Sequence, residues 1–340
     1  MVKKEKIEQN FLSLIEDKYS AFLVRDESTE ELEVISTGSL ALDVSIGVGG
    51  IPRGKFTTLY GPESSGKTTL ALSITKQAYL RGLKTLYIDP ENGLDYKYVE
   101  ALVGTIDSEN LVIIQPETAE QAFEIAEAGI NSGEFGLIIF DSLGALAPKK
   151  VKEGEFNDAH VALVARMVGQ FLARNAYQVR LNNVAFLFVN QIRAKIGGYV
   201  AGYEMPGGYA LKHDSSVIIF LSKGEEIKQG VDSVGIMARF VIKKNKLSAP
   251  FKTNFIPIIF GEGIDSLRDI VLFAEYVGIL NKRGAYYTYE GETLGQGLIK
   301  TMEALRDKKD ILDKIISICY NINIKPSKEI IKEEFNEEVA

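Results

Sequence analysis

The stretch FTTLYGPESSGKTTLALSITKQAY, residues 56–79, places the pattern G-x-x-x-x-G-K-[ST] between an apolar β-type run and a helical run. In this context the pattern is typical of a phosphate-binding loop. Its glycines let successive backbone N–H groups face phosphate oxygens at the start of a helix. Its lysine reaches the β and γ phosphates, and the hydroxyl that follows can bind Mg²⁺. The residues predicted to bind nucleotide are Gly61, Pro62, Glu63, Ser64, Ser65, Gly66, Lys67, Thr68 and Thr69.

Around this loop, short apolar runs alternate with helix-period segments. The runs LKTLYID, NLVIIQ, GLIIFDS and NVAFLFVNQ are separated by segments such as TAEQAFEIAEAGINSG. This alternation predicts βαβ units and an α/β fold with a mainly parallel central sheet, covered on both faces. Functional sites of such sheets lie at the carboxyl ends of the strands. Between residues 215 and 260, three further runs predict additional, antiparallel strands.

Two of the predicted strands end in carboxylates suited to nucleotide hydrolysis. Asp141 ends GLIIFDS, where an acid that orients Mg²⁺ is needed. After TLYID, Pro90 stops the strand and Glu91 follows, a candidate general base for an attacking water. From spacing alone, the role of Glu91 as base is about as probable as a helix-capping or solvent-facing role.

The ends of the chain differ in character from this core. Ile7, Phe11, Leu14 and Ile15 recur at helical spacing before a charged linker, so a lone helix here either folds back or docks on a neighbouring subunit. We therefore divide the chain into residues 1–35, an ATPase core at 36–265, and a small α+β domain with an acidic tail at 266–340.

Composition narrows the functional classes. The 340 residues are 46% hydrophobic and 25% charged, enough for a sizeable core. No apolar run opens the sequence or is long enough to span a bilayer, which predicts a cytoplasmic protein. Cys319 lies in an apolar run and is expected to be a buried hydrophobe, and two histidines are too few for a His-rich metal site. The net charge of −7 argues against a globally basic nucleic-acid binder but leaves a local basic groove possible.

A long glycine-rich segment, NQIRAKIGGYVAGYEMPGGYALKH at 190–213, begins with the last two residues of the apolar run NVAFLFVNQ. Such a loop at a strand end suits an element that ligands order. Arg193, Lys195 and Lys212 can contact phosphate oxygens, and Gly207 and Gly208 allow close approach of the backbone to a nucleic acid.

Read together and in order, these segments resemble the bacterial RecA recombinase family, including its phage-encoded relatives. The resemblance is carried by the stretch at 35–70 and by IDPENGLD, QPETAEQAFEI, IIFDSLGALAPK, EGEFNDAHVALVARM, FVNQIRAKIG, GGYALK, KNKLSAPF and GEGI. It implies an ATP- and Mg²⁺-dependent, DNA-stimulated ATPase that forms a helical filament on single-stranded DNA through its N-terminal helix. Pairing with homologous duplex and strand exchange are implied too. Single-strand-binding and loader proteins are candidate partners.

The resemblance also assigns residues. Glu91 matches the catalytic glutamate, Gln191 the glutamine that senses the γ-phosphate, and Lys244 and Lys246 the cations that reach a neighbour's ATP. Asp95, Tyr98 and Phe260 match residues around the adenine. The two DNA-binding loops match residues 153–160, with Arg166 just after them, and the glycine-rich segment. Residues predicted to bind DNA are Arg166, Arg193, Lys195, Gly207, Gly208 and Lys212.

Departures from the family pattern fall after the second loop. Tyr209 replaces an asparagine, and His213 and Asp214 replace aromatic residues, which puts the strength of coupling between ATP and DNA in question. Two alternatives stay open from the sequence: a ring-forming ATPase or helicase on the same core, and a filament scaffold that binds DNA but hydrolyses slowly.

Overall fold

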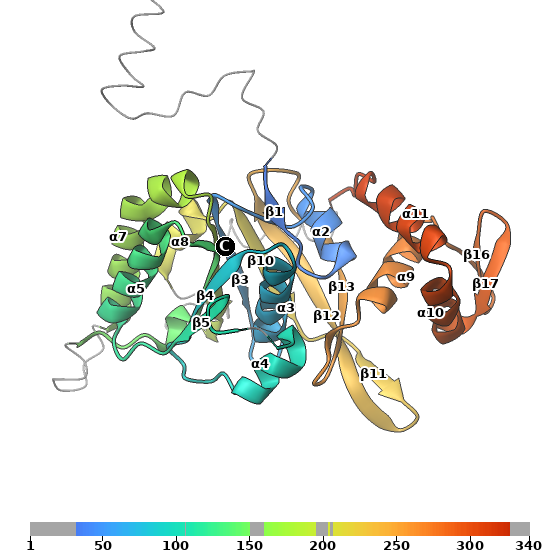
Figure 1. Ribbon diagram of the computed structural model, residues 1–340, viewed down its shortest axis with the longest axis horizontal. Coiled ribbons are helices and arrows are strands. Elements are labelled where there is room, and N and C mark those ends of the chain that lie inside the picture. Colours follow the sequence, from blue (N-terminus) through green and yellow to red (C-terminus); the bar gives the residue numbers. More distant parts are fainter. Residues whose placement is uncertain (1–31, 106, 150–159, 195–202, 205–206, 327–340) are drawn as a thin grey trace, which may run out of the picture. The chain divides into compact units, whose positions relative to one another are not determined.

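The computed structural model describes residues 32–105, 107–149, 160–194, 203–204 and 207–326 (Figure 1). The chain divides into two units, Met1–Glu33 and Val34–Ala340, and all the described helices and strands lie in the second unit. The predicted N-terminal helix, most of the first DNA loop and the acidic tail lie outside the described residues.

A ten-stranded sheet forms the centre of the second unit, in the order β14-β13-β12-β10-β3-β7-β6-β4-β5, with β11 paired to β12. The strands from β10 to β5 run parallel, as the alternating pattern predicts. The strands of this sheet are β3 (Lys55–Gly61), β4 (Lys84–Ile88), β5 (Leu111–Ile114), β6 (Phe135–Asp141), β7 (Ala185–Gln191), β10 (Val217–Ser222), β11 (Glu226–Gln229), β12 (Asp232–Asn245), β13 (Thr253–Ile259) and β14 (Gly263–Ile264).

One strand corrects the sequence-based prediction for residues 215–260. β10 is antiparallel to β12 but parallel to β3, so it joins the parallel and antiparallel halves of the sheet. Its sequence SVIIFLS is apolar on both faces, which fits a strand buried on both sides and does not reveal its direction. The rest of this region is antiparallel as predicted, and β11 and β12 form a hairpin that projects from the sheet (Figure 1).

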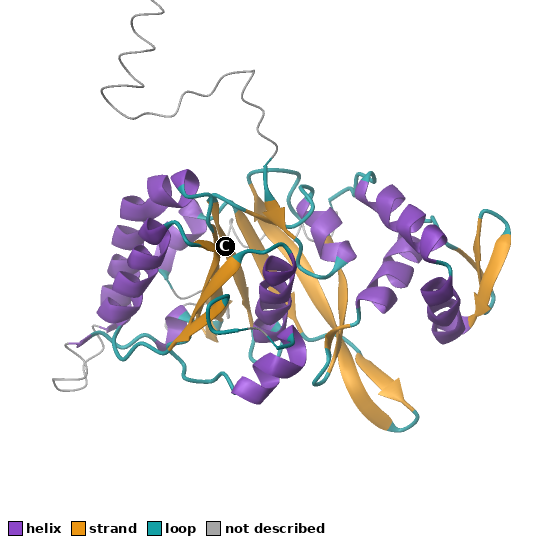
Figure 2. Ribbon diagram, viewed as in Figure 1, coloured by secondary structure: helices purple, strands orange, loops and turns teal. Residues whose placement is uncertain are grey.

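Helices cover both faces of the sheet (Figure 2). One core layer packs α3 and α4 against the sheet, and the other packs α5, α7 and α8. Alternate residues of each strand enter different layers: Tyr87 and Ile139 belong to the first, while Ile88 and Phe140 belong to the second. These helices are α3 (Lys67–Leu80), α4 (Tyr96–Val103), α5 (Ala119–Ser132), α7 (His160–Leu181) and α8 (Gly208–Asp214).

The C-terminal part packs against the core through α2 and α9. Asp43 of α2 accepts hydrogen bonds from Ser36 and Thr37, and Asp269 of α9 accepts one from the Ser39 hydroxyl. Burial raises the pKa of Asp43 to about 6 and that of Asp269 to about 7. The remaining elements are α2 (Leu40–Ile46), α9 (Ser266–Tyr276), β15 (Asn281–Arg283), β16 (Tyr286–Tyr289), β17 (Glu292–Gln296), α10 (Gly297–Asp307) and α11 (Lys309–Tyr320), with the short β1 (Val34–Ile35), β2 (Ile51–Pro52), η1 (Leu143–Ala145), β8 (Arg193–Ala194) and β9 (Tyr203–Glu204).

The sequence predicts that Cys319 is buried and that no segment spans a membrane, and both points concern the fold. Cys319 is fully buried on α11, and burial raises the pKa of its thiol to about 12, which confirms it as a small core residue. Among the described residues, we find no helix with the length and apolar character needed to cross a membrane.

Candidate active site

The carboxyl ends of four adjacent parallel strands meet at one edge of the sheet. The register pairs Gly61 of β3 with Gln191 of β7. On the other side of β7 lies β6, which ends at Asp141, and next to β6 lies β4, which leads into the turn carrying Glu91. A cavity of about 210 Å³ opens here, lined by Glu63, Ser64, Ser65, Gly66, Lys67, Thr68, Thr69, Glu91, Asp141 and Gln191.

The phosphate loop connects β3 directly to α3. Gly66, the residue before the helix, has φ 92°, and a Cβ at this position would lie 2.4 Å from Ile258 Cδ1. Glycine is favoured at this turn because other residues rarely adopt this φ, and a Cβ here would require the end of the Ile258 side chain to move. Ser65 Oγ is buried and, within the described residues, has no hydrogen-bond partner. A phosphate oxygen is a natural acceptor for such a hydroxyl, so the loop fits a nucleotide.

Lys67 places a buried ammonium group at this loop. Its Nζ donates to the carbonyl of Pro62 at 2.7 Å. Burial lowers the pKa of Lys67, and the negative charges of Asp141, Glu91 and Glu63 oppose this shift. A cation this desolvated attracts a polyphosphate more strongly than a surface lysine does.

Asp141 is the acid best placed for Mg²⁺. Its Oδ2 accepts hydrogen bonds from Thr68 Oγ1 at 3.0 Å and from the hydroxyl of Tyr87 at 2.7 Å. Burial raises the pKa of Asp141 to about 6, although both hydrogen bonds act to lower it. In the described parts of the chain, no cluster of three or more His, Cys, Asp or Glu could hold a metal ion. One carboxylate and one hydroxyl fit Mg²⁺, which usually keeps water and phosphate ligands.

Glu91 and Gln191 are hydrogen-bonded to each other. Gln191 Nε2 lies 3.2 Å from Glu91 Oε1 and 3.4 Å from Oε2, and Ser142 Oγ also donates to Oε1. The turn that presents Glu91 is held by Asp89, which is buried and accepts bonds from the backbone N–H of residues 93 and 94. The predicted base and the predicted sensor therefore form one hydrogen-bonded unit.

The residues predicted to surround the adenine lie on two elements: Asp95 and Tyr98 at the start of α4, and Phe260 directly after β13. Asp95 caps α4 by accepting a hydrogen bond from Tyr98 N. The Tyr98 hydroxyl lies 2.8 Å from Thr69 Oγ1, which joins α4 to the first turn of α3. Phe260 is 56% exposed and follows β13, whose Ile258 approaches Gly66. Their contacts with a base remain a prediction.

Lys244 and Lys246 lie away from this cavity and bind α8 of the same chain. Lys244 Nζ donates to the carbonyls of Lys212 and His213 at 2.6 Å each, and Lys246 Nζ donates to that of His213 at 3.1 Å. These carbonyls end α8, where the helix dipole favours cations. Burial and the charge of Lys246 lower the pKa of Lys244.

Four of the six residues predicted to bind DNA, Arg166, Gly207, Gly208 and Lys212, lie on α7 or at and along α8. Gly207 and Gly208 begin α8 with φ 98° and 72°, and a Cβ on Gly208 would lie 3.1 Å from Ala165 of α7. Arg166 follows Ala165 and is exposed, as is Lys212 on α8. Lys195 lies outside the described residues, and only the backbone of Arg193 is described.

The residues that depart from the family pattern lie on α8 too. Tyr209 is 83% exposed, and its ring stacks near that of His213 at 6.5 Å between centroids. His213 Nδ1 lies 2.9 Å from Asp214 Oδ1. The three residues therefore form a polar and aromatic surface on the helix whose last carbonyls the two lysines bind.

Sequence reasoning missed two residues of the site, Tyr87 and Ser142. Both touch a predicted catalytic or metal-binding carboxylate. For Tyr87 the signal in the sequence was a hydroxyl group inside the run TLYI, because a buried tyrosine hydroxyl needs a hydrogen-bond partner. For Ser142 the signal was its position directly after Asp141.

Comparison with known proteins shows similarity along nearly the whole chain. Residues 5–265 match the family described as RecA N-terminal domain, and residues 268–318 match RecA C-terminal domain. A protein named Protein RecA from Thermus thermophilus is 41% identical over 317 residues, which cover 92% of this chain and 93% of the relative. Proteins of the same name from Clostridioides difficile and Latilactobacillus sakei are 40% and 39% identical, over 96% of this chain in both cases and 95% and 91% of the relatives.

Proposed function

The chain belongs to the RecA family, and on that premise we propose that the cavity at the sheet edge hydrolyses ATP between subunits of a filament on single-stranded DNA. The protein is a DNA-dependent ATPase of homologous recombination, which pairs the bound strand with homologous duplex and exchanges strands. A role in DNA repair and a cytoplasmic location follow from this proposal.

The residues of the cavity divide the chemistry among them. ATP would supply the phosphoryl group, and Mg²⁺ would supply positive charge for its transfer. Lys67 and the loop N–H groups would hold the phosphates, Thr68 and Asp141 would hold the metal ion, and Glu91 would accept the proton of the attacking water. Asp95, Tyr98 and Phe260 enclose the base in this proposal.

The observation that carries the proposal is the contact between Gln191 and Glu91. Gln191 ends β7, touches the catalytic carboxylate, and starts the segment that leads to Gly207 and α8. A γ-phosphate near Glu91 competes for the Gln191 amide, so binding of ATP can move the start of that segment. Arg166, Arg193, Lys195, Lys212 and the N–H groups of Gly207 and Gly208 then contact the DNA backbone without reading its sequence.

We expect Gln191→Ala to abolish the stimulation of ATP turnover by single-stranded DNA, lowering DNA-stimulated turnover by about tenfold or more while basal turnover stays. Steady-state hydrolysis with and without single-stranded DNA measures this. Gln229→Ala, an exposed glutamine of the β11–β12 hairpin, is the matched control. If the wild type ignores DNA altogether, a slowly hydrolysing scaffold or a ring ATPase explains the chain better.

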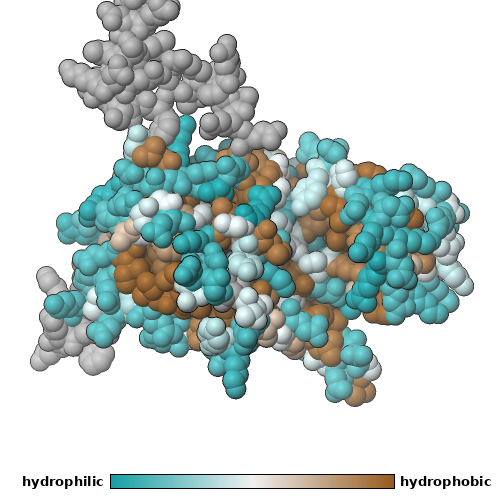
Figure 3. Space-filling model, in the orientation of Figure 1, coloured by the Kyte–Doolittle hydropathy of each residue, from teal (hydrophilic) through white to brown (hydrophobic). Residues whose placement is uncertain are grey.

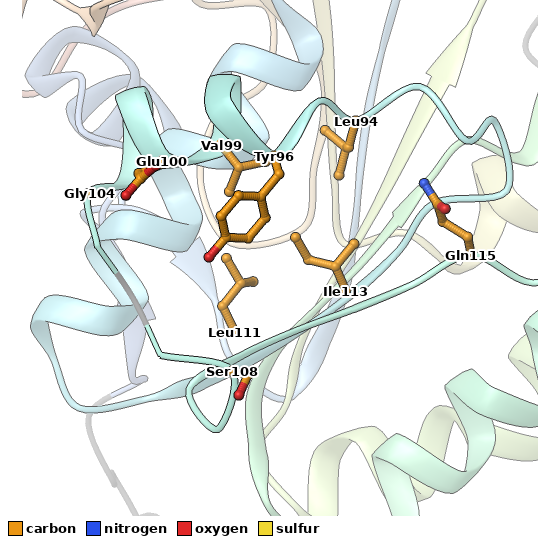
Figure 4. Close-up of a pocket in the computed structure, with 9 residues that line it drawn as sticks. All are labelled: Leu94, Tyr96, Val99, Glu100, Gly104, Ser108, Leu111, Ile113 and Gln115. Carbon is orange, nitrogen blue, oxygen red and sulfur yellow. The ribbon is translucent and has the colours of Figure 1, made fainter.

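We further propose that the edge strand β5 receives the N-terminal segment of a neighbouring subunit. In the described part of the chain β5 pairs with β4 alone, and hydrophobic surface gathers over this side of the sheet (Figure 3). A cavity of about 410 Å³ lies beside it, where the Tyr96 ring points toward Leu111 and Ile113 (Figure 4). The apolar residues Ile7, Phe11, Leu14 and Ile15 are the occupants we assign to it.

Replacing Tyr96 with alanine removes an aromatic side chain that is 69% exposed in this cavity. Since aromatic anchors dominate interfaces, we expect assembly to weaken about tenfold, measured by sedimentation velocity with ATP and Mg²⁺. Tyr276→Ala on α9, 60% exposed, is the control and should assemble normally. Deletion of residues 1–31 should give the same loss as Tyr96→Ala. Normal assembly of both variants would place the subunit interface elsewhere.

A further inference from the structure

Tyr87 is a buried tyrosine in the middle of an apolar layer, under the phosphate loop. It lies on β4, is fully buried, and packs in the core layer that contains Leu70 of α3 and Ile139 of β6. A phenylalanine would fill this space equally well, so packing does not account for the hydroxyl group. The hydroxyl donates to Asp141 Oδ2 at 2.7 Å.

The hydrogen bonds on Asp141 are distributed unevenly. Thr68 Oγ1 and the Tyr87 hydroxyl both donate to Oδ2, and within the described residues these are the hydrogen bonds that Asp141 accepts. Oδ1 is therefore the oxygen left for a water molecule or a cation. Two donors from different elements, β4 and α3, fix the rotation of the carboxylate about its Cβ–Cγ bond.

We propose that Tyr87 is a positioning residue for Mg²⁺, which locks Asp141 with Oδ2 turned to the protein and Oδ1 turned to the metal and its waters. This inference rests on the proposed function, since it assumes that the cavity takes Mg²⁺ with its nucleotide. Residues that hydrogen-bond to a metal-binding carboxylate commonly determine the affinity for the metal. They fix the orientation of the carboxylate before the metal binds, so binding does not carry the entropy cost of orienting it.

Thr68 cannot replace Tyr87 in this role. Thr68 is itself the hydroxyl expected to bind Mg²⁺ through an oxygen lone pair, so its position has to satisfy the metal as well as Asp141. Tyr87 has no such second task. Its phenol is buried and directed at Asp141 Oδ2, so it stays a donor to that oxygen.

The test is Tyr87→Phe, measured by nucleotide binding instead of turnover. Binding of a fluorescent ADP is titrated in EDTA and then at rising Mg²⁺. In EDTA we expect the affinity of the variant to stay within about twofold of wild type, because the loop and Lys67 are intact. The Mg²⁺ concentration that gives half of the metal-dependent tightening should rise about tenfold.

Tyr287→Phe supplies the matched control. Tyr287 is 2% exposed, and its hydroxyl donates to Glu275 Oε2 at 2.8 Å in the C-terminal part, so its loss removes a buried tyrosine hydrogen bond away from the metal. This control should keep the wild-type Mg²⁺ midpoint. If Tyr87→Phe also keeps it and changes only the thermal midpoint, Tyr87 is structural and the inference fails. Loss of Mg²⁺-dependent binding in the wild type itself would instead refute the proposed function.

Discussion

Glu91→Gln should lower DNA-stimulated ATP turnover by about a thousandfold, within the range that general bases contribute. The amide cannot accept a proton from the attacking water, yet it has nearly the same size and can still accept a hydrogen bond from Ser142. Nucleotide binding should stay close to wild type, since the residues proposed to hold the phosphates and the metal, Lys67, Thr68 and Asp141, are unchanged. Single-turnover hydrolysis with single-stranded DNA present measures the chemical step.

The control for this variant is Glu117→Gln, an exposed glutamate in the segment after β5. It makes the same change of charge near the same edge of the sheet and should leave turnover unchanged. DNA binding offers a second readout: with hydrolysis blocked, the Glu91→Gln filament should persist on single-stranded DNA after free ATP is diluted. Turnover within tenfold of wild type would show that another group activates the water.

Much of this site could be predicted from the sequence because its chemistry follows strand ends. The carboxyl ends of parallel strands lie at the same edge of the sheet. A polar residue that directly follows an apolar run is therefore expected at that edge. That is why Asp141 and Glu91, far apart in the chain, could be assigned to one site, whereas the role of Gln191 was implied by the family resemblance. The structure places all three along one cavity, and it joins Gln191 to Glu91 and Thr68 to Asp141 by hydrogen bonds that spacing does not show.

The features that escaped prediction depend on side-chain direction or strand order. Tyr87 reads as one more apolar strand residue, and only the fold shows its hydroxyl against Asp141. The direction of β10 depends on its placement between β3 and β12, which its uniform apolar sequence does not encode. The contacts of Lys244 with α8 join residues about 30 positions apart, and they depend on how β12 passes the end of that helix.

We propose that those contacts give Lys244 and Lys246 a place in the coupling of ATP to DNA. Within one subunit the two ammonium groups hold the last carbonyls of α8, the helix that begins at the glycines proposed to contact DNA. In the proposed filament the same groups reach the ATP of the next subunit. An ammonium group that moves toward a phosphate releases the carbonyls of Lys212 and His213. ATP would therefore act on the C-terminal end of α8, and DNA would act on its N-terminal end.

Double replacement Lys244→Ala/Lys246→Ala should lower DNA-stimulated turnover by about a thousandfold, since cations supplied across a subunit boundary contribute at least that much to phosphoryl transfer. The loss alone does not show where the lysines act, because α8 also loses its anchors. Mixing with Glu91→Gln separates the two explanations. In a head-to-tail polymer, each active site uses Glu91 of one subunit and Lys244 and Lys246 of the next. A site has all three residues when the first subunit is the lysine variant and the second is the Glu91 variant.

Random mixing at equal amounts should therefore restore about a quarter of wild-type turnover from two inactive proteins, as expected for a heterologous interface. Glu91→Gln mixed with Lys67→Ala is the control: both lesions lie in the same subunit's cavity, so no junction is complete and turnover stays low. If the lysine variant is not rescued while it still enters filaments, Lys244 and Lys246 act only through their own α8, and the cation on the transferring phosphoryl group has to come from another residue.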